Sequence, residues 1–158
     1  MRKAIEMRAP FSVHEAYIRK FQHTDPMTRE PVKDAAFDGL EAAIREARAR
    51  VESMAKLPDA IMGDNKFSHK SNTERLRNEL LRRAVATEML LDDALKGACT
   101  ALTHLRSGIF DERTPHNRNR PCSAKLDHAK RLGKAIEATQ RARRAVRSFA
   151  NGIIQEYC

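Results

Sequence analysis

Closely spaced arginine and lysine residues are the part of this sequence whose type and spacing most clearly predict a chemical role. Residues 113–147 contain 11 basic residues against only Asp127 and Glu137, whereas residues 1–112 contain 19 basic and 18 acidic residues. One segment therefore accounts for the +9 net charge of the chain. Guanidinium and ammonium groups bind phosphate oxygens, and counterion release makes such binding strongly dependent on salt. The charge pattern favours binding of a polyanion, either RNA or DNA.

Several of these cations share one face of a helix predicted over residues 123–156. Four of them recur at spacings of 4, 7 and 3 residues, two more form a neighbouring pair four residues apart, and two precede the helix. No aromatic residue lies between Phe110 and Phe149, so contacts with the phosphate backbone are favoured over base stacking. The candidate nucleic-acid-binding residues are Arg118, Arg120, Lys130, Lys134, Arg141, Arg143, Arg144 and Arg147.

The same charge has two other interpretations. The basic face could be solvated or paired with carboxylates of another helix, such as Asp92 and Asp93, because net charge alone governs solubility and non-specific association. It could also bind an acidic protein, in which case the chain would be an interaction module such as an adaptor, chaperone, inhibitor or effector.

Metal binding and catalysis find little support in the remaining polar residues. Cys99 and His104 are five residues apart and Cys122 and His128 are six apart, whereas side chains on one helix face recur at three or four. Structural zinc sites use closer Cys and His pairs. The glycine-rich phosphate-binding and dinucleotide-binding patterns are absent too. We therefore expect no metal, no cofactor and no enzymatic activity.

The three cysteines and the hydropathy pattern favour a reducing, cytoplasmic setting. Three irregularly spaced cysteines do not form a disulfide framework, and Cys99 is expected to be a small core residue. The longest stretch without a charged residue is the nine residues from Gly97 to Leu105, far short of the roughly 20 that a membrane-spanning helix needs. The N-terminal residues carry no apolar segment of the secretory type.

Helices must position all of these residues. With 41% hydrophobic, 32% charged and 5% aromatic residues, the composition favours an all-α bundle over a sheet. We predict an up-down helical bundle in a single domain over residues 1–158, made of a short N-terminal helix and three long ones. A basic loop over residues 107–122 should precede the last helix, and Pro58 should end the second. The predicted helices cover about residues 12–23, 32–57, 73–106 and 123–156.

Apolar seams indicate how these helices pack. The seam of the second helix recurs at steps of three and four residues, a spacing that keeps one narrow face toward a partner helix. Because such a seam could also pair with a second copy of the chain, a homo-oligomer through the helix over residues 33–57 is a further expectation. The residues of this apolar seam are Phe37, Leu40, Ile44, Ala47, Val51 and Met54.

Overall fold

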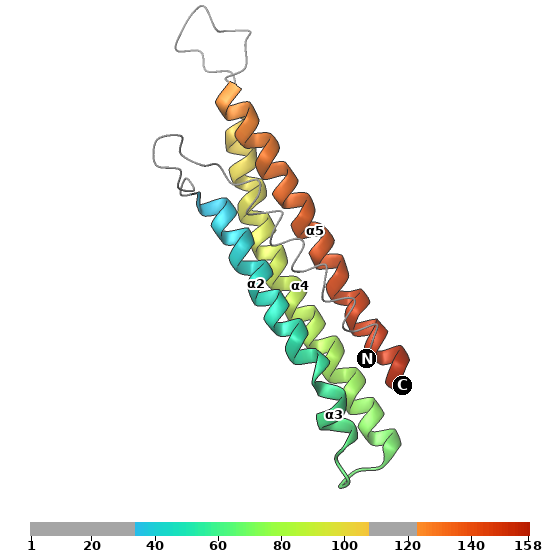
Figure 1. Cartoon of the computed structure of the whole chain (residues 1–158). Helices are drawn as coiled ribbons and strands as arrows, with labels where there is room; N and C mark the ends of the chain where they lie inside the picture. The colour runs from blue at the N-terminus through green and yellow to red at the C-terminus, as the bar shows by residue number, and fades with distance from the viewer. Residues whose placement is uncertain (1–33, 108–122) are drawn as a thin grey trace, which may run out of the picture.

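The computed structural model describes residues 34–107 and 123–158, which form helices and short connections without any strand. Helix α2 (Ala35–Ala55) continues into the short α3 (Leu57–Met62), and together they make one bent helix of 28 residues. Helices α4 (His69–Ser107) and α5 (Ser123–Tyr157) are the two long ones. Figure 1 shows the three rods lying side by side and running in alternating directions. The predicted all-α up-down bundle is confirmed, while the helix predicted at residues 12–23 lies outside the described residues.

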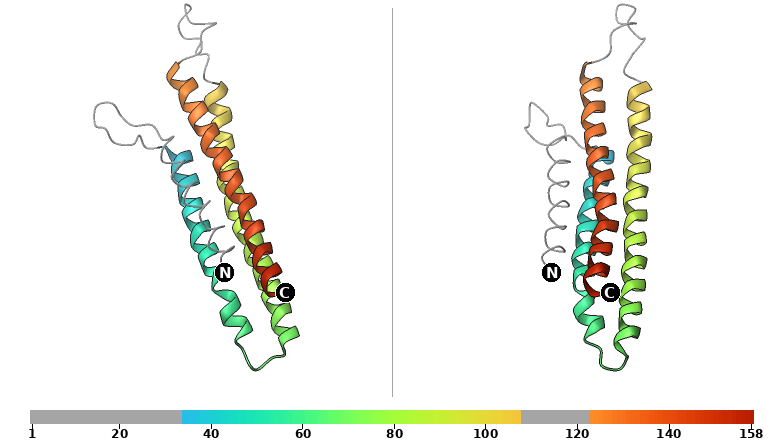
Figure 2. Two further views of the ribbon diagram at one scale, coloured as in Figure 1. Left: turned by 45° about the vertical axis from the view of Figure 1, so that its right-hand side comes forward. Right: turned by 90° about the vertical axis from the view of Figure 1, so that its right-hand side faces the viewer.

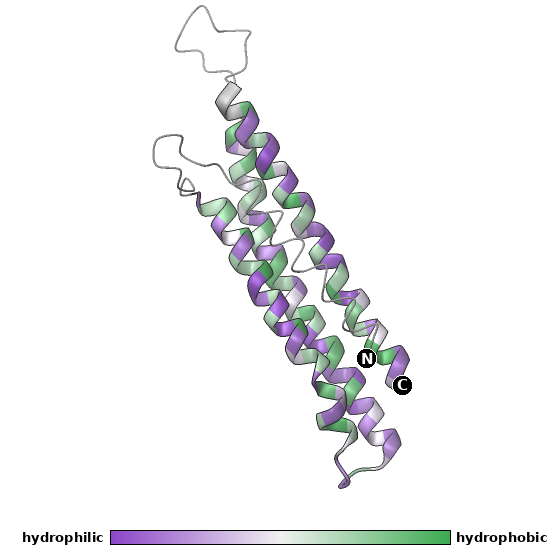
Figure 3. Cartoon of the chain, in the orientation of Figure 1, coloured by the Kyte–Doolittle hydropathy of each residue, from purple (hydrophilic) through white to green (hydrophobic). Residues whose placement is uncertain are grey.

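The apolar seams of α2, α4 and α5 meet in one core. All six residues of the predicted α2 seam are at most 1% exposed, and Leu132, Val146 and Phe149 of α5 are fully buried. The α2 seam is therefore used inside the chain, so an oligomer formed through this helix would have to use another face. Figure 2 shows α4 and α5 adjacent along most of their length, and Figure 3 shows hydrophilic and hydrophobic residues alternating around every helix.

Asp34 begins α2 and also links it to α5. Its Oδ1 accepts a hydrogen bond from the backbone N–H of Ala36 at 2.9 Å, in the usual manner of an N-cap aspartate. Its other carboxylate oxygen lies 2.6 Å from Nε2 of His128 on α5. The His128 ring in turn packs edge-on against buried Phe37, with ring centroids 5.9 Å apart. One carboxylate thus starts a helix and holds it against its neighbour.

Replacing Asp34 with alanine is expected to lower the free energy of unfolding by about 1–2 kcal/mol, because the cap and the contact with His128 are both lost. Urea denaturation followed by circular dichroism measures the change. Asp34→Asn is the matched control, since asparagine caps helices as well as aspartate does but removes the carboxylate oxygen that faces His128. Equal losses in the two variants would show that the cap contributes nothing.

The bend between α2 and α3 lies at Lys56 and Pro58. Proline has no N–H to donate to the carbonyl of Met54, so the α-helical hydrogen-bond pattern is interrupted there. The N–H of Lys56 instead bonds to the carbonyl of Ser53 at 3.2 Å, which tightens the turn. Pro58 then occupies the first turn of α3, where its missing N–H costs nothing. The prediction that the second helix ends before Pro58 is confirmed, since α2 ends at Ala55, but the short helix α3 that follows was not expected.

The start of α4 also differs from the prediction. The helix was expected to begin at about residue 73, but α4 begins at His69. Ser68 is the cap: its Oγ accepts the N–H of Ser71 at 3.2 Å, and its carbonyl accepts the N–H of Asn72 at 2.9 Å. Asn72 is 3% exposed and donates from Nδ2 to the carbonyl of Asp64 at 2.9 Å, which ties the preceding loop to the helix.

The outer side of α4 carries Cys99, which was expected in the core. Cys99 is exposed, because the inward positions in this part of α4 are Leu95, Ala98 and Leu102. Met89, also on α4, is 61% exposed. Within residues 34–107 and 123–158, no helix combines the length and apolar character needed to cross a bilayer.

Candidate nucleic-acid interface

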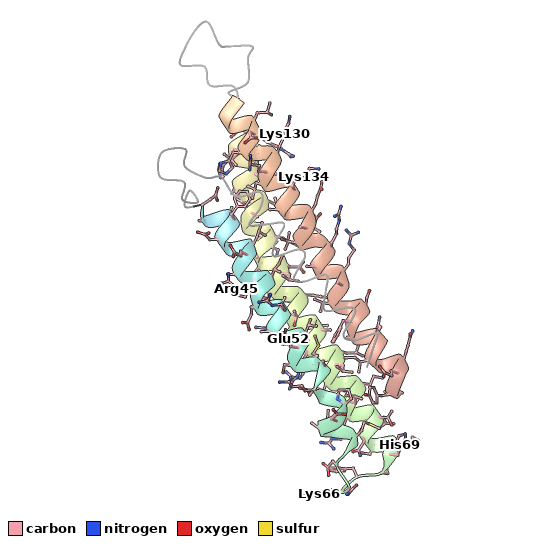
Figure 4. All side chains as sticks on the ribbon, viewed as in Figure 1. Arg45, Glu52, Lys66, His69, Lys130 and Lys134 are labelled. Carbon is pink, nitrogen blue, oxygen red and sulfur yellow. The ribbon has the colours of Figure 1, made fainter. Side chains whose placement is uncertain are left out.

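Four of the candidate cations lie on one outward face of α5. Lys130, Lys134, Arg141 and Arg144, hereafter the α5 basic stripe, are all exposed. Their positions follow the helical repeat, so one continuous regular helix sets their spacing. Figure 4 shows Lys130 and Lys134 extending away from the bundle near the N-terminal end of α5. The stripe extends over 14 residue steps, or about 21 Å along the helix axis.

The cations of the α5 basic stripe are not neutralised by carboxylates of the described residues. None of the four forms a hydrogen bond or an ion pair with another residue in the described ranges. Exposed Glu137 lies on the same face, three residues after Lys134 and four before Arg141, and lowers the local balance from four positive charges to three. The stripe therefore presents a net positive face to solvent.

Arg143 and Arg147 have a different role, because both are bound to carboxylates of α4. The Nε of Arg143 lies 2.5 Å from Oδ1 of Asp92, and its Nη2 lies 3.3 Å from the other carboxylate oxygen. Arg147 binds both oxygens of Glu88, at 3.0 and 3.2 Å. Such two-point contacts fix the geometry of a guanidinium group. The expected pairing with carboxylates of another helix is therefore found for two residues: Arg143 pairs with Asp92, and Arg147 pairs with Glu88. Exposed Asp93 forms no ion pair with a described residue.

These two bridges are expected to stabilise the fold modestly. Glu88 is only 13% exposed, so its pair with Arg147 is the better shielded of the two. In a double-mutant cycle of Arg147→Ala and Glu88→Ala, we expect a coupling energy of about 0.5–1 kcal/mol, at the upper end for exposed ion pairs. Additive effects of the two substitutions would contradict this. The cycle of Arg50→Ala and Glu46→Ala, a pair within α2 whose side chains are 40% and 55% exposed, should give a smaller coupling.

The remaining candidate residues, Arg118 and Arg120, lie outside the described residues. Sequence reasoning missed the role of Glu88 as a partner of Arg147. A signal was present: Glu88 and Asp92 are four residues apart, as are Arg143 and Arg147. Two acidic residues and two basic residues with the same spacing can pair when their helices are antiparallel neighbours.

Comparisons with known proteins do not assign the chain to a family. No family model, no curated protein and no solved structure matches it. Within the two described ranges, no three or more His, Cys, Asp or Glu residues gather in a way that could hold a metal ion. The chemistry of the α5 basic stripe therefore has to be judged from its own geometry and charge.

Proposed function

We propose that this chain binds the phosphate backbone of RNA or DNA through the α5 basic stripe, and that it is a cytoplasmic accessory or assembly protein rather than an enzyme. The observation that carries the proposal is the division of the α5 cations into two groups. Arg143 and Arg147 are bound to α4 carboxylates, whereas the four cations of the stripe face solvent without a carboxylate partner among the described residues.

Contacts with phosphates are a better fit to this surface than reading of bases. The aromatic residues of α5 are Phe149, which is fully buried, and Tyr157, which is half-buried and lies far along the helix from the stripe. A platform on which bases could stack is therefore missing from the stripe itself. A row of cations about 21 Å long spans roughly six phosphates of one strand of a duplex. Binding of a polynucleotide should therefore depend only weakly on its base sequence.

Binding to polynucleotides at several salt concentrations tests the proposal. If all four cations contact phosphates, the logarithm of the binding constant for duplex DNA should fall with the logarithm of salt concentration with a slope of about −3.6. Fluorescence anisotropy with labelled duplexes of unrelated base sequence measures both the slope and the specificity. Absence of binding at about 50 mM salt, to single and double strands of RNA and DNA alike, would refute the proposal.

An acidic protein partner is the second candidate, and one observation favours it. Val85 and Met89 lie one turn apart on α4 and are 43% and 61% exposed. Methionine is enriched in protein interfaces relative to the rest of the protein surface. Recovery of partners from a cell extract with and without nuclease treatment separates the two proposals. Nucleic-acid binding predicts that nuclease removes the partners, whereas retention that survives nuclease and is lost in Met89→Ser supports the protein partner.

A further inference from the structure

Three arginines meet at a hollow between α2 and α4. The hollow has a volume of about 230 Å³ and is lined by two residues of α2 and four of α4. No acidic residue is among them. This α2–α4 hollow is built without residues of α5, so it is separate from the α5 basic stripe. Its lining residues are Arg50, Ser53, Arg82, Arg83, Ala86 and Thr87.

Glu79 holds two of these arginines in place. Arg82 donates to both oxygens of the Glu79 carboxylate, and Arg83 donates to it from Nε at 2.8 Å. Hydrogen bonds from Arg82, and then from Arg83, lower the pKa of Glu79 to about 2, so this carboxylate stays ionised in mildly acidic solution as well as at neutral pH. Arg83 also reaches across to α2, where its Nη1 donates to Oγ of Ser53 at 3.2 Å. The two guanidinium groups are thus oriented before any ligand arrives.

Each arginine of the hollow retains hydrogen-bond donors for a ligand. A guanidinium group carries five N–H donors in a rigid fork. Within the described residues, Nη1 of Arg82, Nη2 of Arg83 and both terminal nitrogens of Arg50 have no hydrogen-bond partner, since Arg50 uses only Nε toward Glu46. Glu46 and Glu79 leave one net positive charge among these five side chains. The hollow therefore offers several N–H donors and a net attraction for a negative group.

The size of the hollow limits what can occupy it. Sites for drug-sized ligands are roughly 300–1,000 Å³, so a volume of about 230 Å³ suits a smaller group. Thr87 offers no donor to a ligand, because it is fully buried and its hydroxyl donates to the carbonyl of Arg83 at 2.8 Å. A tetrahedral oxyanion is small and accepts hydrogen bonds from several directions, which matches guanidinium groups that come from two helices.

We propose that the α2–α4 hollow binds the phosphate group of a small phosphomonoester through Arg50, Arg82 and Arg83. The two α4 arginines, fixed by Glu79, hold one side of the phosphate, and Arg50 of α2 closes the other. This site lies apart from the α5 basic stripe and does not depend on polynucleotide binding. Occupation would link α2 to α4 and stabilise the bundle by binding the folded state.

Titration of the full chain with inorganic phosphate, and separately with phenyl phosphate, tests the site by nuclear magnetic resonance. Both ligands should shift the backbone amide signals of Ser53, Ala86 and Thr87 in a saturable way, and neither should shift those of the α5 basic stripe. Unshifted amides at about 10 mM of either ligand would overturn the proposal. Shifts produced only by an oligonucleotide, and by neither small ligand, would overturn it as well.

Two variants and one control locate the binding. Arg50→Gln should weaken phosphate binding about fivefold to tenfold, because it removes a charge-assisted contact and leaves the Glu79 network intact. Ala86→Glu places a carboxylate at the hollow from an exposed position of α4 and should abolish binding. The control is Arg45→Gln, also on α2, where Arg45 pairs with Glu41 as Arg50 does with Glu46. Equal weakening in Arg45→Gln and Arg50→Gln would show that only general charge matters.

Discussion

Replacing Lys130, Lys134, Arg141 and Arg144 with glutamate is expected to reduce polynucleotide affinity at least about 100-fold at low salt. The reason is that every phosphate contact proposed for α5 becomes a repulsion. The salt dependence should nearly vanish, since each lost cation lowers the slope by about one. Because all four side chains are exposed, helicity should be unchanged. Anisotropy with a labelled duplex and circular dichroism measure the two effects.

The experiment must distinguish the effect of the net charge of the chain from the effect of where the cations lie on the bundle. Each substitution changes the charge by two, so the quadruple variant falls from a net charge of +9 to +1. The matched control makes the same change at Lys56, Lys66, Lys70 and Arg77, which are also exposed but lie at the other end of the bundle. This control should retain most of the affinity. If it loses as much as the α5 variant, binding depends on overall charge and the proposed interface is wrong.

Truncation of Phe149 to alanine is the substitution with the largest expected effect on stability. Its side chain is fully buried and is one of the largest in the core, so truncation removes apolar surface that folding buries and leaves a cavity. We expect the free energy of unfolding to fall by about 3–5 kcal/mol. Urea denaturation followed by circular dichroism gives this value, provided that a single cooperative transition is seen.

The matched control for Phe149→Ala is Met89→Ala on α4. Met89 is 61% exposed, so removing its side chain creates no cavity, and the change should stay within about 0.5 kcal/mol. If Phe149→Ala cost less than about 1 kcal/mol, Phe149 would not be packed in the core as described.

The core of the bundle could be predicted well because helical periodicity marks it directly. Phe37, Leu40 and Val51 recur at the spacing of one helix face, and all three are buried. It was harder to predict which side of a helix faces the core where apolar residues occur all around that helix. Met89 and Leu91 are both apolar and two residues apart, yet only Leu91 is buried, because the direction of the neighbouring helices decides which side faces inward. The hydrophobic pattern of one helix does not show on which side its neighbouring helices lie.

Helix ends were less predictable for local reasons. Ser68 and Ser71 are both residues that cap helices, and the bond from Asn72 to Asp64 favours the earlier start by holding the loop close. At the candidate interface, the exposure of Lys130 and Lys134 followed from their place opposite the core face. The engagement of Arg143 by Asp92 spans 51 residues and depends on how α4 and α5 are aligned. The α2–α4 hollow was missed for the same reason, because its arginines come from two helices.

The two ion pairs between α4 and α5 also determine how far one helix can slide along the other. With Arg143 at Asp92 and Arg147 at Glu88, both bridges are satisfied at once. A slip of one turn in one direction would bring Arg147 to Asp92 but set Arg143 against Lys96, two like charges. A slip the other way would leave Arg147 opposite Ala84, which cannot bind it. Only one register keeps both bridges, so these four side chains select a single alignment of the hairpin.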